Sequence, residues 1–427
     1  MSDILIKGGR VIDPKTGLDK KQDVLVRGNK IVQIDKKIDR KDAFLIDARG
    51  KIVCPGFIDL HCHLRDPGRP DEETIESGSN SAVAGGFTTI CCMPNTTPPI
   101  DNEGVVSYIY QEAGRVNLCR IFPIAAITKQ RAGKEITEFG ELVKAGAKGF
   151  SDDGDVVANA EVLRYALEYS KTFGLPIFEH PIDENLSRNS SMNEGFTSTR
   201  LGLKGSPAVA EEIIVARDLL LAKFTGARLH LCHISTRGAV ELIRQAKKDG
   251  IQVTCETCPH YLYFNDKVLE EFDTNYKVNP PIREEADRRA IIEGLKDGTI
   301  DCIATDHAPH CEAEKELEFT TAPTGMIGFE TALSMVTAEL VNRHKFGWLE
   351  VIEKMTVNPA KILHLDLGVL KKGAVADITI FDPQKRWKVT PGTIKSKSKN
   401  TPFLNKQLVG KSIGVIVNGE LKYYEED

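Results

Sequence analysis

The segment that decides the fold begins at Gly56 and reads GFIDLHCH to His63. It is an apolar run that ends in two histidines, and because side chains alternate along a strand, both imidazoles lie on the same side of it. Seven more short apolar runs follow, so that the predicted strands cover 56–63, 88–93, 120–127, 148–151, 176–180, 228–233, 252–256 and 301–305. Strands that alternate with amphipathic helices in this way pair in parallel through right-handed crossovers.

The helix signals between the strands are clearest from Ser206 to Gly226. Ser206 and Pro207 supply an N-cap and a first helical residue, and Gly226 ends the helix. Between them lie apolar residues at helical spacing: Val209, Ile213, Leu220 and Phe224. Eight strand–helix units predict an α/β fold, a (β/α)₈ TIM-like barrel. The alternative, a doubly wound open sheet, does not need eight units and would carry a glycine-rich phosphate loop after its first strand, which this sequence lacks.

Both ends of the chain read as β-hairpins. Strand-like runs flank a Gly28-Asn29 turn near the N-terminus and an Asn418-Gly419 turn near the C-terminus. The runs are 3–11, 23–27, 30–34, 376–381, 414–417 and 421–423. Because neither group could bury a core alone, we expect a small composite β-sandwich domain of residues 1–54 and 366–427, beside a barrel of residues 55–365.

The composition is that of an ordinary globular protein. Of 427 residues, 41% are hydrophobic and 27% are charged, which excludes a disordered or fibrous chain. The net charge is −5 and there is no polybasic tract, so neither nucleic acid nor a membrane is expected as a partner. The first residues lack a basic region followed by a long apolar stretch, which predicts a cytoplasmic location. The ten cysteines are irregularly spaced and read as reduced residues, several of them inside apolar strands.

Polar residues gather where predicted strands end, and in a barrel this is where the chemistry takes place. These residues are His61, His63, Asp152, Asp153, Glu179, His180, His233, Asp306 and His307. An isolated His-x-His is more often structural and a terminal Asp is often a helix cap. Histidines and carboxylates that converge on one barrel mouth, however, suit zinc or a similar divalent ion. We interpret them as a two-metal site with a bridging carboxylate and an activated water.

Other histidines and cysteines carry weaker signals. His230 points to the opposite face of its strand from His233 and is expected to pack against a helix. His260 ends the seventh strand without a partner that can be named. Cys255 and Cys258 spell a CxxC, but without a second pair this is a weak zinc or redox signal, and we interpret it as incidental.

With these residues the chain resembles the cyclic amidohydrolases, and most closely the bacterial type I dihydroorotases. The resemblance covers essentially the whole chain and rests on eight motifs in order. They are PGFIDLHCHLRDPG (55–68), MPNTTPP (93–99), FSDDG (150–154), FEHPID (178–183), HLCHIST (230–236), ETCPHYL (256–262), NPPIR (279–283) and ATDHAPH (304–310). One such motif would be a weak signal, whereas eight in order are specific.

The resemblance implies reversible, zinc-dependent hydrolysis of (S)-dihydroorotate to N-carbamoyl-L-aspartate, with one or two zinc ions per subunit. The implied metal ligands are His61 and His63 at the more buried position, His180 and His233 at the more exposed one, Asp153 as the bridge, and Asp306. Asp306 is also the implied general acid/base. It accepts the proton of a metal-bound hydroxide and passes it to the leaving amide nitrogen.

The resemblance assigns the substrate carboxylate to Arg65, Asn95 and His310. A guanidinium at Arg65 suits this role because it can make two parallel charge-assisted hydrogen bonds. The alternative for Arg65 is an ion pair with Asp66 or another acid of its loop.

The remaining substrate contacts are expected at the ring. Asn279 is expected to hydrogen-bond the ring, and the alternative for it is a turn residue before two prolines. Backbone groups at Ala322 and Gly325 are expected to contribute, while Thr324 stands where the family pattern leads us to expect an aromatic residue.

Several alternatives stay open at this point. A carboxylated Lys148 could bridge the metals in place of Asp153. The rival activities are those of an allantoinase or a hydantoinase, and the rival of another class is a metal-free scaffold that binds aspartate transcarbamoylase. As an enzyme, the protein is expected to form a homo-oligomer or to assemble with aspartate transcarbamoylase.

Overall fold

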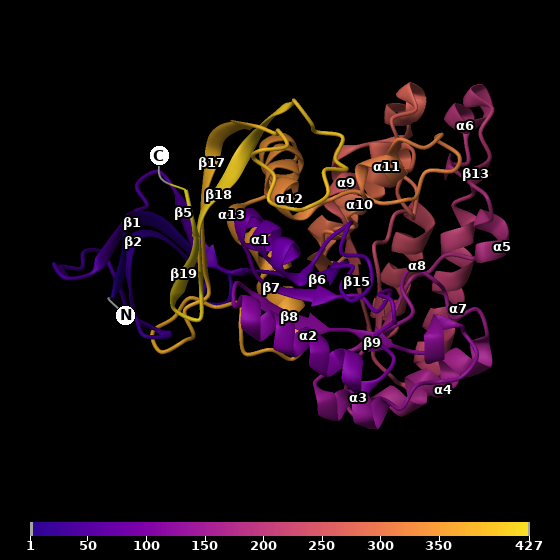
Figure 1. Cartoon of the computed structure of the whole chain (residues 1–427), viewed down its shortest axis with the longest axis horizontal. Helices are drawn as coiled ribbons and strands as arrows, with labels where there is room; N and C mark the ends of the chain where they lie inside the picture. Colours follow the sequence, from indigo (N-terminus) through magenta and orange to yellow (C-terminus); the bar gives the residue numbers. More distant parts are fainter. Residues whose placement is uncertain (1–2, 426–427) are drawn as a thin grey trace.

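The computed structural model describes residues 3–425 and contains the expected barrel (Figure 1). Its strands are β6 (Phe57–Cys62), β7 (Phe87–Cys92), β8 (Arg120–Pro123), β9 (Ala125–Ala126), β10 (Phe150–Ser151), β11 (Ile177–Glu179), β14 (Leu229–Leu231), β15 (Val253–Thr257) and β16 (Cys302–Ile303). All eight predicted strands are present, and the third is divided into β8 and β9.

Parallel pairing closes the barrel. One ladder runs β6-β7-β8 and a second runs β9-β10-β11-β14-β15-β16, and the consecutive strands β8 and β9 join the two on one side. On the other side the His63 N–H donates to the carbonyl of His307 at 2.9 Å, and the Asp306 N–H donates to the carbonyl of His61 at 3.0 Å. The first and last strands therefore meet through residues that belong to the candidate site.

Helices surround the barrel (Figure 1). The longer ones are α1 (Ile75–Gly85), α2 (Glu103–Val116), α3 (Phe139–Ala145), α4 (Ala160–Lys171), α7 (Val209–Thr225), α8 (Arg237–Lys248), α10 (Glu285–Asp297), α12 (Phe329–Val336), α13 (Trp348–Met355) and α14 (Val357–Ile362). Shorter elements occupy the loops: α5 (Glu184–Ser187), α6 (Phe196–Leu201), α9 (Pro259–Tyr263), α11 (Glu312–Lys315), β12 (Met192–Asn193) and β13 (Gly205–Ser206). None of the helices within residues 3–425 combines the length and apolar composition that a membrane crossing requires.

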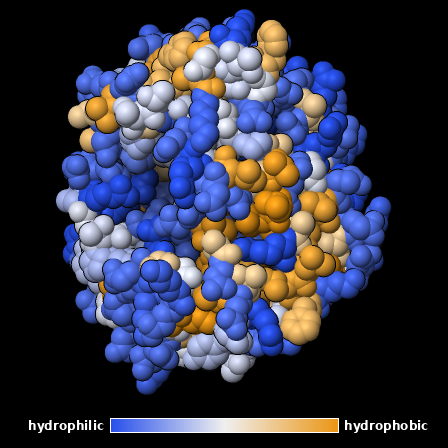
Figure 2. Space-filling view, turned by 90° about the vertical axis from the view of Figure 1, so that its right-hand side faces the viewer, coloured by the Kyte–Doolittle hydropathy of each residue, from blue (hydrophilic) through white to orange (hydrophobic). Residues whose placement is uncertain are grey.

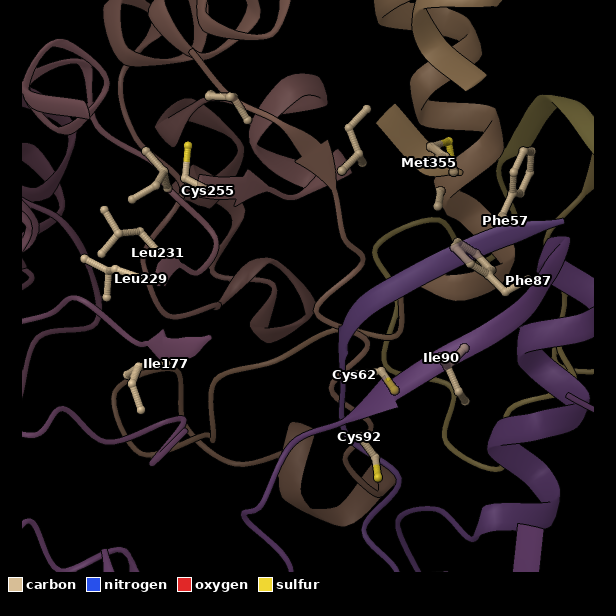
Figure 3. Packing of buried hydrophobic residues seen from close by; sticks show 14 of the residues in the cluster. Phe57, Cys62, Phe87, Ile90, Cys92, Ile177, Leu229, Leu231, Cys255 and Met355 are labelled. Atoms are coloured by element: carbon tan, nitrogen blue, oxygen red, sulfur yellow. The ribbon is translucent and has the colours of Figure 1, made fainter. Parts of the chain in front are cut away.

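Side chains alternate along the strands between two cores. The outer core packs against the helices, and Figure 3 shows Phe57 and Phe87 there, with ring centroids 5.8 Å apart, near Met355 of α13. The inner core fills the barrel with side chains such as Phe178 and Cys232. All ten cysteines are free and nine are buried, as expected. The candidate ligands therefore lie over a packed, apolar floor.

Both ends of the chain contribute to one eight-stranded sheet, on the left in Figure 1. Its order is β19-β18-β17-β5-β1-β2-β3, with β4 beside β1. The strands are β1 (Ile4–Asp13), β2 (Leu18–Arg27), β3 (Lys30–Asp35), β4 (Phe44–Asp47), β5 (Ile52–Pro55), β17 (Ile378–Lys388), β18 (Gln407–Val417) and β19 (Glu420–Tyr424). Both predicted hairpin turns are present, and the two ends of the chain meet where β17 pairs antiparallel with β5, as expected. The domain boundaries stay a prediction, and residues 1–2 and 426–427 lie outside the described chain.

The connection between β17 and β18, residues 389–406, reaches from the sheet across the barrel, and we call it the strap (Figure 1). Two carboxylates hold it, the buried Glu73 and the half-buried Glu330. Glu73 accepts from the Ser396 hydroxyl and from the Lys397 N–H, and Glu330 accepts from the Ser396 N–H at 3.1 Å. The strap brings Asn400, far along the chain, next to the loops that follow β16.

Helix α7 forms where it was predicted, but its start and its exposed face differ from expectation. Gly226 caps its C-terminus with φ 63°, as expected. Ser206 is not the N-cap, because it pairs with Asn193 as part of β13 and the helix begins after Ala208. The stripe that revealed the helical period faces solvent, while α7 buries its other face against the barrel. The period was therefore informative about the helix and misleading about which side is buried.

Candidate metal-binding active site

Asp153 occupies the centre of the strand ends, where it follows β10 with a buried side chain. Its Oδ1 lies 3.3 Å from His61 Nε2 and 3.4 Å from both His180 Nδ1 and His233 Nε2. Its Oδ2 lies 3.6 Å from His63 Nε2. The four predicted histidines therefore converge on one carboxylate, with three imidazoles at one oxygen and the fourth at the other.

Asp306 follows β16 and completes the cluster. Its Oδ1 lies 3.1 Å from His63 Nε2 and 3.7 Å from His61 Nε2. Its backbone φ is 47°, and that of His233 is 36°, which is the left-handed region that residues other than glycine rarely adopt. Backbone strain of this kind concentrates at functional sites.

The cluster contains two buried polar atoms that face each other and have no hydrogen-bond partner among residues 3–425: His61 Nε2 and Asp153 Oδ1. Atoms of this kind are costly to bury unless something else satisfies them. Two triads bring their ligand atoms within 4.8 Å of one another, namely His61–His63–Asp306 and His61–Asp153–His233. Imidazole nitrogens and carboxylate oxygens are the donors of zinc and similar ions. The residues present therefore fit one or two divalent cations.

The electrostatics of the cluster favour ionised carboxylates. Burial raises the pKa of Asp153, but the charge of His61 and the nearby imidazoles of His180 and His233 outweigh it and hold that pKa well below its ordinary value. The pKa of Asp306 is likewise lowered, because the neighbouring histidines outweigh the effect of burial. Both carboxylates are therefore deprotonated at neutral pH, as metal ligands must be.

Behind the histidines lies a buried carboxylate that the sequence analysis missed. Glu256 of β15 accepts from His61 Nδ1 at 2.9 Å through one oxygen, and its other oxygen lies 3.2 Å from His230 Nε2. Burial raises the pKa of Glu256, but hydrogen bonds from His230 and His61 outweigh it and bring the pKa to about 2. A carboxylate in this position fixes the orientation and tautomer of a ligating imidazole. The sequence contained a signal for Glu256, because it is a charged residue inside an apolar strand. Such a residue is expected to be buried and therefore paired with another polar group.

The expectation that His230 packs against a helix is wrong. Its side chain points into the barrel, where its ring centroid lies 4.7 Å from that of Phe178 and its Nδ1 lies 2.8 Å from Thr254 Oγ1. Leu229 and Leu231, on either side of it, belong to the outer core instead. His230 therefore extends the hydrogen-bonded chain from His61 through Glu256 into the barrel.

Two asparagines predicted to contact substrate also hold histidines of the cluster. Asn95 Oδ1 lies 2.7 Å from His63 Nδ1, and Asn279 Nδ2 donates to His180 Nε2 at 3.2 Å. Hydrogen bonds of this type orient a ligating ring. Their contact with substrate stays a prediction.

The cluster opens into a cavity of about 460 Å³. Ten of the predicted site residues line it: His63, Arg65, Asn95, Asp153, His180, His233, Asn279, Asp306, His310 and Gly325. His61 and Ala322 do not line the cavity, whereas Arg69 and Arg131, which were not predicted, do. The cavity therefore combines the candidate ligands with three arginines.

Arg65 is buried in one wall of this cavity. Its Nε lies 2.9 Å from a carboxylate oxygen of Glu72 and donates to the Pro309 carbonyl at 3.1 Å, so it has the ion pair that was the alternative interpretation, with Glu72 in place of Asp66. Its Nη2 lies 3.4 Å from His310 Nε2. Burial lowers the pKa of Arg65 to about 10, which leaves it charged at neutral pH. Burial and the charge of Arg65 lower the pKa of His310 to about 3, so that its ring is neutral.

Two buried lysines hold the loop that carries Ala322 and Gly325 by hydrogen bonds to its backbone carbonyls. The Lys277 ammonium donates to the carbonyls of Phe319, Thr320 and Ala322 at 2.7, 3.0 and 2.7 Å. The Lys315 ammonium donates to the Pro323 and Gly325 carbonyls at 2.9 and 3.1 Å. The Ala322 N–H donates to Glu318 and the Gly325 N–H to Lys277, both at 2.8 Å. The backbone groups predicted to contact substrate thus have protein partners, and their role stays a prediction.

Asn400 of the strap fixes the same wall. Its side-chain oxygen accepts from the His310 N–H at 3.2 Å, and its amide donates to the carbonyls of Ala308 and Gly325 at 3.0 and 3.1 Å. Nothing in the spacing of the sequence linked this residue to a site some 90 positions earlier.

The remaining candidates lie apart from the Asp153 cluster or at its edge. Lys148, the alternative bridge, has its ammonium 5.6 Å from the centre of the Phe122 ring. Cys258 and His260 group with Asp306, and burial lowers the pKa of His260 to about 4. The Nε2 of His260 is buried without a partner among the described residues.

Comparison with known proteins agrees with this geometry. A sequence profile described as "Dihydro-orotase-like" matches residues 50–239. The chain is 48% identical to the dihydroorotase of Trichlorobacter lovleyi over 421 residues, which cover 98% of this chain and 99% of that protein. It is 48% identical to the dihydroorotase of Syntrophus aciditrophicus over 425 residues, 99% of this chain and 100% of that protein.

The structure is similar to solved barrels of related proteins. The L-hydantoinase (dihydropyrimidinase) of Arthrobacter aurescens superposes with a TM-score of 0.87 at 26% identity, covering 100% of this chain and 97% of that one. The D-hydantoinase of a Thermus species superposes with a TM-score of 0.83 at 23% identity, covering 99% and 95%, which shows the shared fold alone. The full-length relatives at 48% identity decide the family. The chain belongs to the dihydroorotase family.

Proposed function

We propose that this protein is a dihydroorotase, which hydrolyses (S)-dihydroorotate reversibly to N-carbamoyl-L-aspartate and closes the ring in the biosynthetic direction. The observation that carries the proposal is that Arg65, a buried cation, lines the same cavity as the cluster around Asp153. A histidine and carboxylate cluster suits hydrolysis of an amide, and a guanidinium suits a ring that bears a carboxylate.

The proposed cofactor is zinc, with one or two ions per subunit. His61 and His63 would hold the more buried ion, His180 and His233 the more exposed one, and Asp153 would lie between them. The unpaired ring nitrogen of His61 and the central carboxylate of Asp153 support this assignment. When bound, the metal supplies polarisation of the ring carbonyl and activation of water.

The proposed general acid/base is Asp306. Its carboxylate lines the cavity next to His63 and is ionised at neutral pH, so it can accept the proton of the attacking water. The same group then donates that proton to the amide nitrogen as the ring opens. In the reverse direction Asp306 removes a proton from the carbamoyl nitrogen, and water leaves.

The proposed carboxylate site consists of Arg65 and His310, with Asn95 and Asn279 nearer to the ring. Glu72 and the Pro309 carbonyl hold Nε of the guanidinium, and its Nη2 lies beside His310, so the substrate carboxylate would bind the Nη edge next to that histidine. His310 is neutral, so it adds a hydrogen bond without a second charge. A substrate without a carboxylate would leave the buried charge of Arg65 without a ligand partner, which disfavours a hydantoinase or an allantoinase.

The test is turnover of L-dihydroorotate by the purified protein, followed as loss of ring ultraviolet absorbance with metal counted on the same sample. We expect turnover that a chelator abolishes and added zinc restores. Turnover of allantoin or hydantoin in place of dihydroorotate would assign a rival amidohydrolase activity. Absence of both turnover and metal would favour the scaffold.

We further propose a cytoplasmic enzyme that works as a homo-oligomer, with a barrel domain of residues 55–365 and a composite domain of residues 1–54 and 366–427. The shared sheet of both termini supports the composite domain. Association with aspartate transcarbamoylase stays a prediction, which sedimentation of a mixture of the two proteins tests.

A further inference from the structure

Helix α7 is apolar on two opposite faces. Its inner face packs against the barrel through residues such as Ile214 and Leu219. Its outer face carries four exposed side chains: Val209, Ile213, Leu220 and Phe224, which are 48%, 50%, 69% and 69% exposed. A helix that is hydrophobic all round is typically buried. Figure 2, which faces this side of the molecule, shows hydrophobic side chains gathered there.

Neighbouring helices continue this outer face. Tyr165 of α4 and Leu186 of α5 are 45% and 40% exposed, and both helices contact α7. The guanidinium of Arg164 on α4 lies 5.2 Å from the centre of the Phe224 ring. At about 1.5 Å per residue and about 10 Å of width, the 17 residues of α7 and the 12 of α4 offer roughly 430 Å², about half of the ~800 Å² that each partner buries in a stable dimer. In the dimer, α5 and the adjoining loops supply the rest of the contact.

The stripe on α7 is symmetric along the helix. Val209 and Ile213 are four positions apart, Ile213 and Leu220 seven, and Leu220 and Phe224 four, so the pattern reads the same from either end. Its centre falls between residues 216 and 217, and Ala216 there is small enough for two helices to approach closely. If two copies of α7 pack antiparallel about this centre, Val209 of each meets Phe224 of the other and Ile213 meets Leu220 of the other.

The charges beside the stripe agree with the same arrangement. Glu212 and Lys223 are eleven positions apart, close to three helical turns, and therefore lie on the same flank of the stripe. Their midpoint lies within about one residue of the apolar centre. In an antiparallel pair about a two-fold axis, Lys223 of each copy faces Glu212 of the other.

From the palindromic stripe and its flanking charges we infer that the outer face of α7 is the self-association surface of this protein, where two copies pack their α7 helices antiparallel about a two-fold axis. The inference is independent of the proposed reaction, because none of the four stripe residues lines the cavity at the Asp153 cluster. The dimer leaves each active site complete within its own chain.

Sedimentation equilibrium of the full chain tests the inference. We expect wild type to have twice the mass of one chain at micromolar concentration. Leu220→Glu should raise the dissociation constant at least about 100-fold, because the two-fold axis places the change in the interface twice. Leu45→Glu is the matched control, since Leu45 is a 54% exposed leucine on β4, and it should leave the mass unchanged. Circular dichroism of both variants checks that they fold.

A charge exchange tests the antiparallel register. Lys223→Glu should weaken the dimer by placing it against Glu212 of the other copy, and adding Glu212→Lys should restore the dimer. A monomeric wild type would overturn the inference, as would a dimer that Leu220→Glu leaves intact. A wild type whose mass rises only when aspartate transcarbamoylase is added would assign the face to that partner instead.

Discussion

Two walls of one cavity are built in different ways. The first, which we call the metal wall because we propose that it holds the metal, consists of side chains at the ends of β6, β10, β11, β14 and β16, five strands of the same barrel. The second, which we call the recognition wall because we propose that it binds the substrate carboxylate, consists of Arg65, His310 and the loop up to Gly325. Lys277 and Asn400, from distant parts of the chain, hold the backbone of this wall through hydrogen bonds to its carbonyls. The first wall is positioned by strand pairing, and the second depends on buried hydrogen bonds between loops.

The largest expected effect is on the metal wall, at Asp306. Asp306→Asn keeps the size of the side chain but removes the base, so kcat for dihydroorotate should fall by about 10²–10⁴-fold. Steady-state kinetics with metal analysis of the same sample measure it. A variant that keeps its metal and near-normal kcat would remove Asp306 as the acid/base.

The next effect separates the two walls. Arg65→Ala should raise KM for dihydroorotate roughly 100-fold, because it removes a buried charge that pairs with the substrate carboxylate, while metal content stays the same. Arg65→Lys should recover part of the loss, since it keeps the charge without the fork of donors. Arg115→Ala, at an exposed arginine, is the control. An unchanged KM in Arg65→Ala would place the carboxylate elsewhere.

A smaller effect is expected behind the metal wall. Glu256→Gln should lower metal affinity by about 10–100-fold, because His61 loses the carboxylate that orients it. Competition with a chelator measures this affinity, and Glu76→Gln, at an exposed glutamate, is the matched control. Equal affinity in both variants would show that Glu256 serves the packing of the barrel and not the metal.

The smallest effect is expected at the strap. Asn400→Ala removes three hydrogen bonds, to His310, Ala308 and Gly325, so KM should rise by up to about 10-fold with kcat nearly unchanged. The exposed Asn342→Ala is its control. A fall in kcat without a change in KM would mean that the strap serves the metal wall as well.

The metal wall was predictable because strand period and barrel geometry act locally. An apolar run that ends in a polar residue, as at His61 or Asp306, reveals both the strand and the position of its end. Glu256 was missed although its signal was present, because a charge inside a strand was not treated as a buried, paired group. His230 was misplaced because strand alternation shows that two faces exist without showing which one points inward.

The recognition wall was less predictable for a physical reason. Lys277 and Asn400 act on backbone carbonyls of loops, and a carbonyl is present at every residue, so no residue pattern marks the partner. The stripe on α7 led to a different error: its helical period predicted the helix correctly, but the stripe was taken as the buried face and is exposed in the single chain. The period alone does not distinguish an exposed apolar face from a buried one. Family motifs drew attention to Arg65 and His310, both of which line the cavity, where spacing could not.

The central claim is that both walls act on one substrate, and the most direct measurement is the ratio of kcat/KM for dihydroorotate to that for dihydrouracil, the same ring without its carboxylate. We predict that wild type prefers dihydroorotate by at least about 10³-fold. Arg65→Ala should lose most of this preference because its kcat/KM for dihydroorotate falls, while its kcat/KM for dihydrouracil stays the same. Equal use of both rings by wild type, or a preference that survives in Arg65→Ala, would contradict the account.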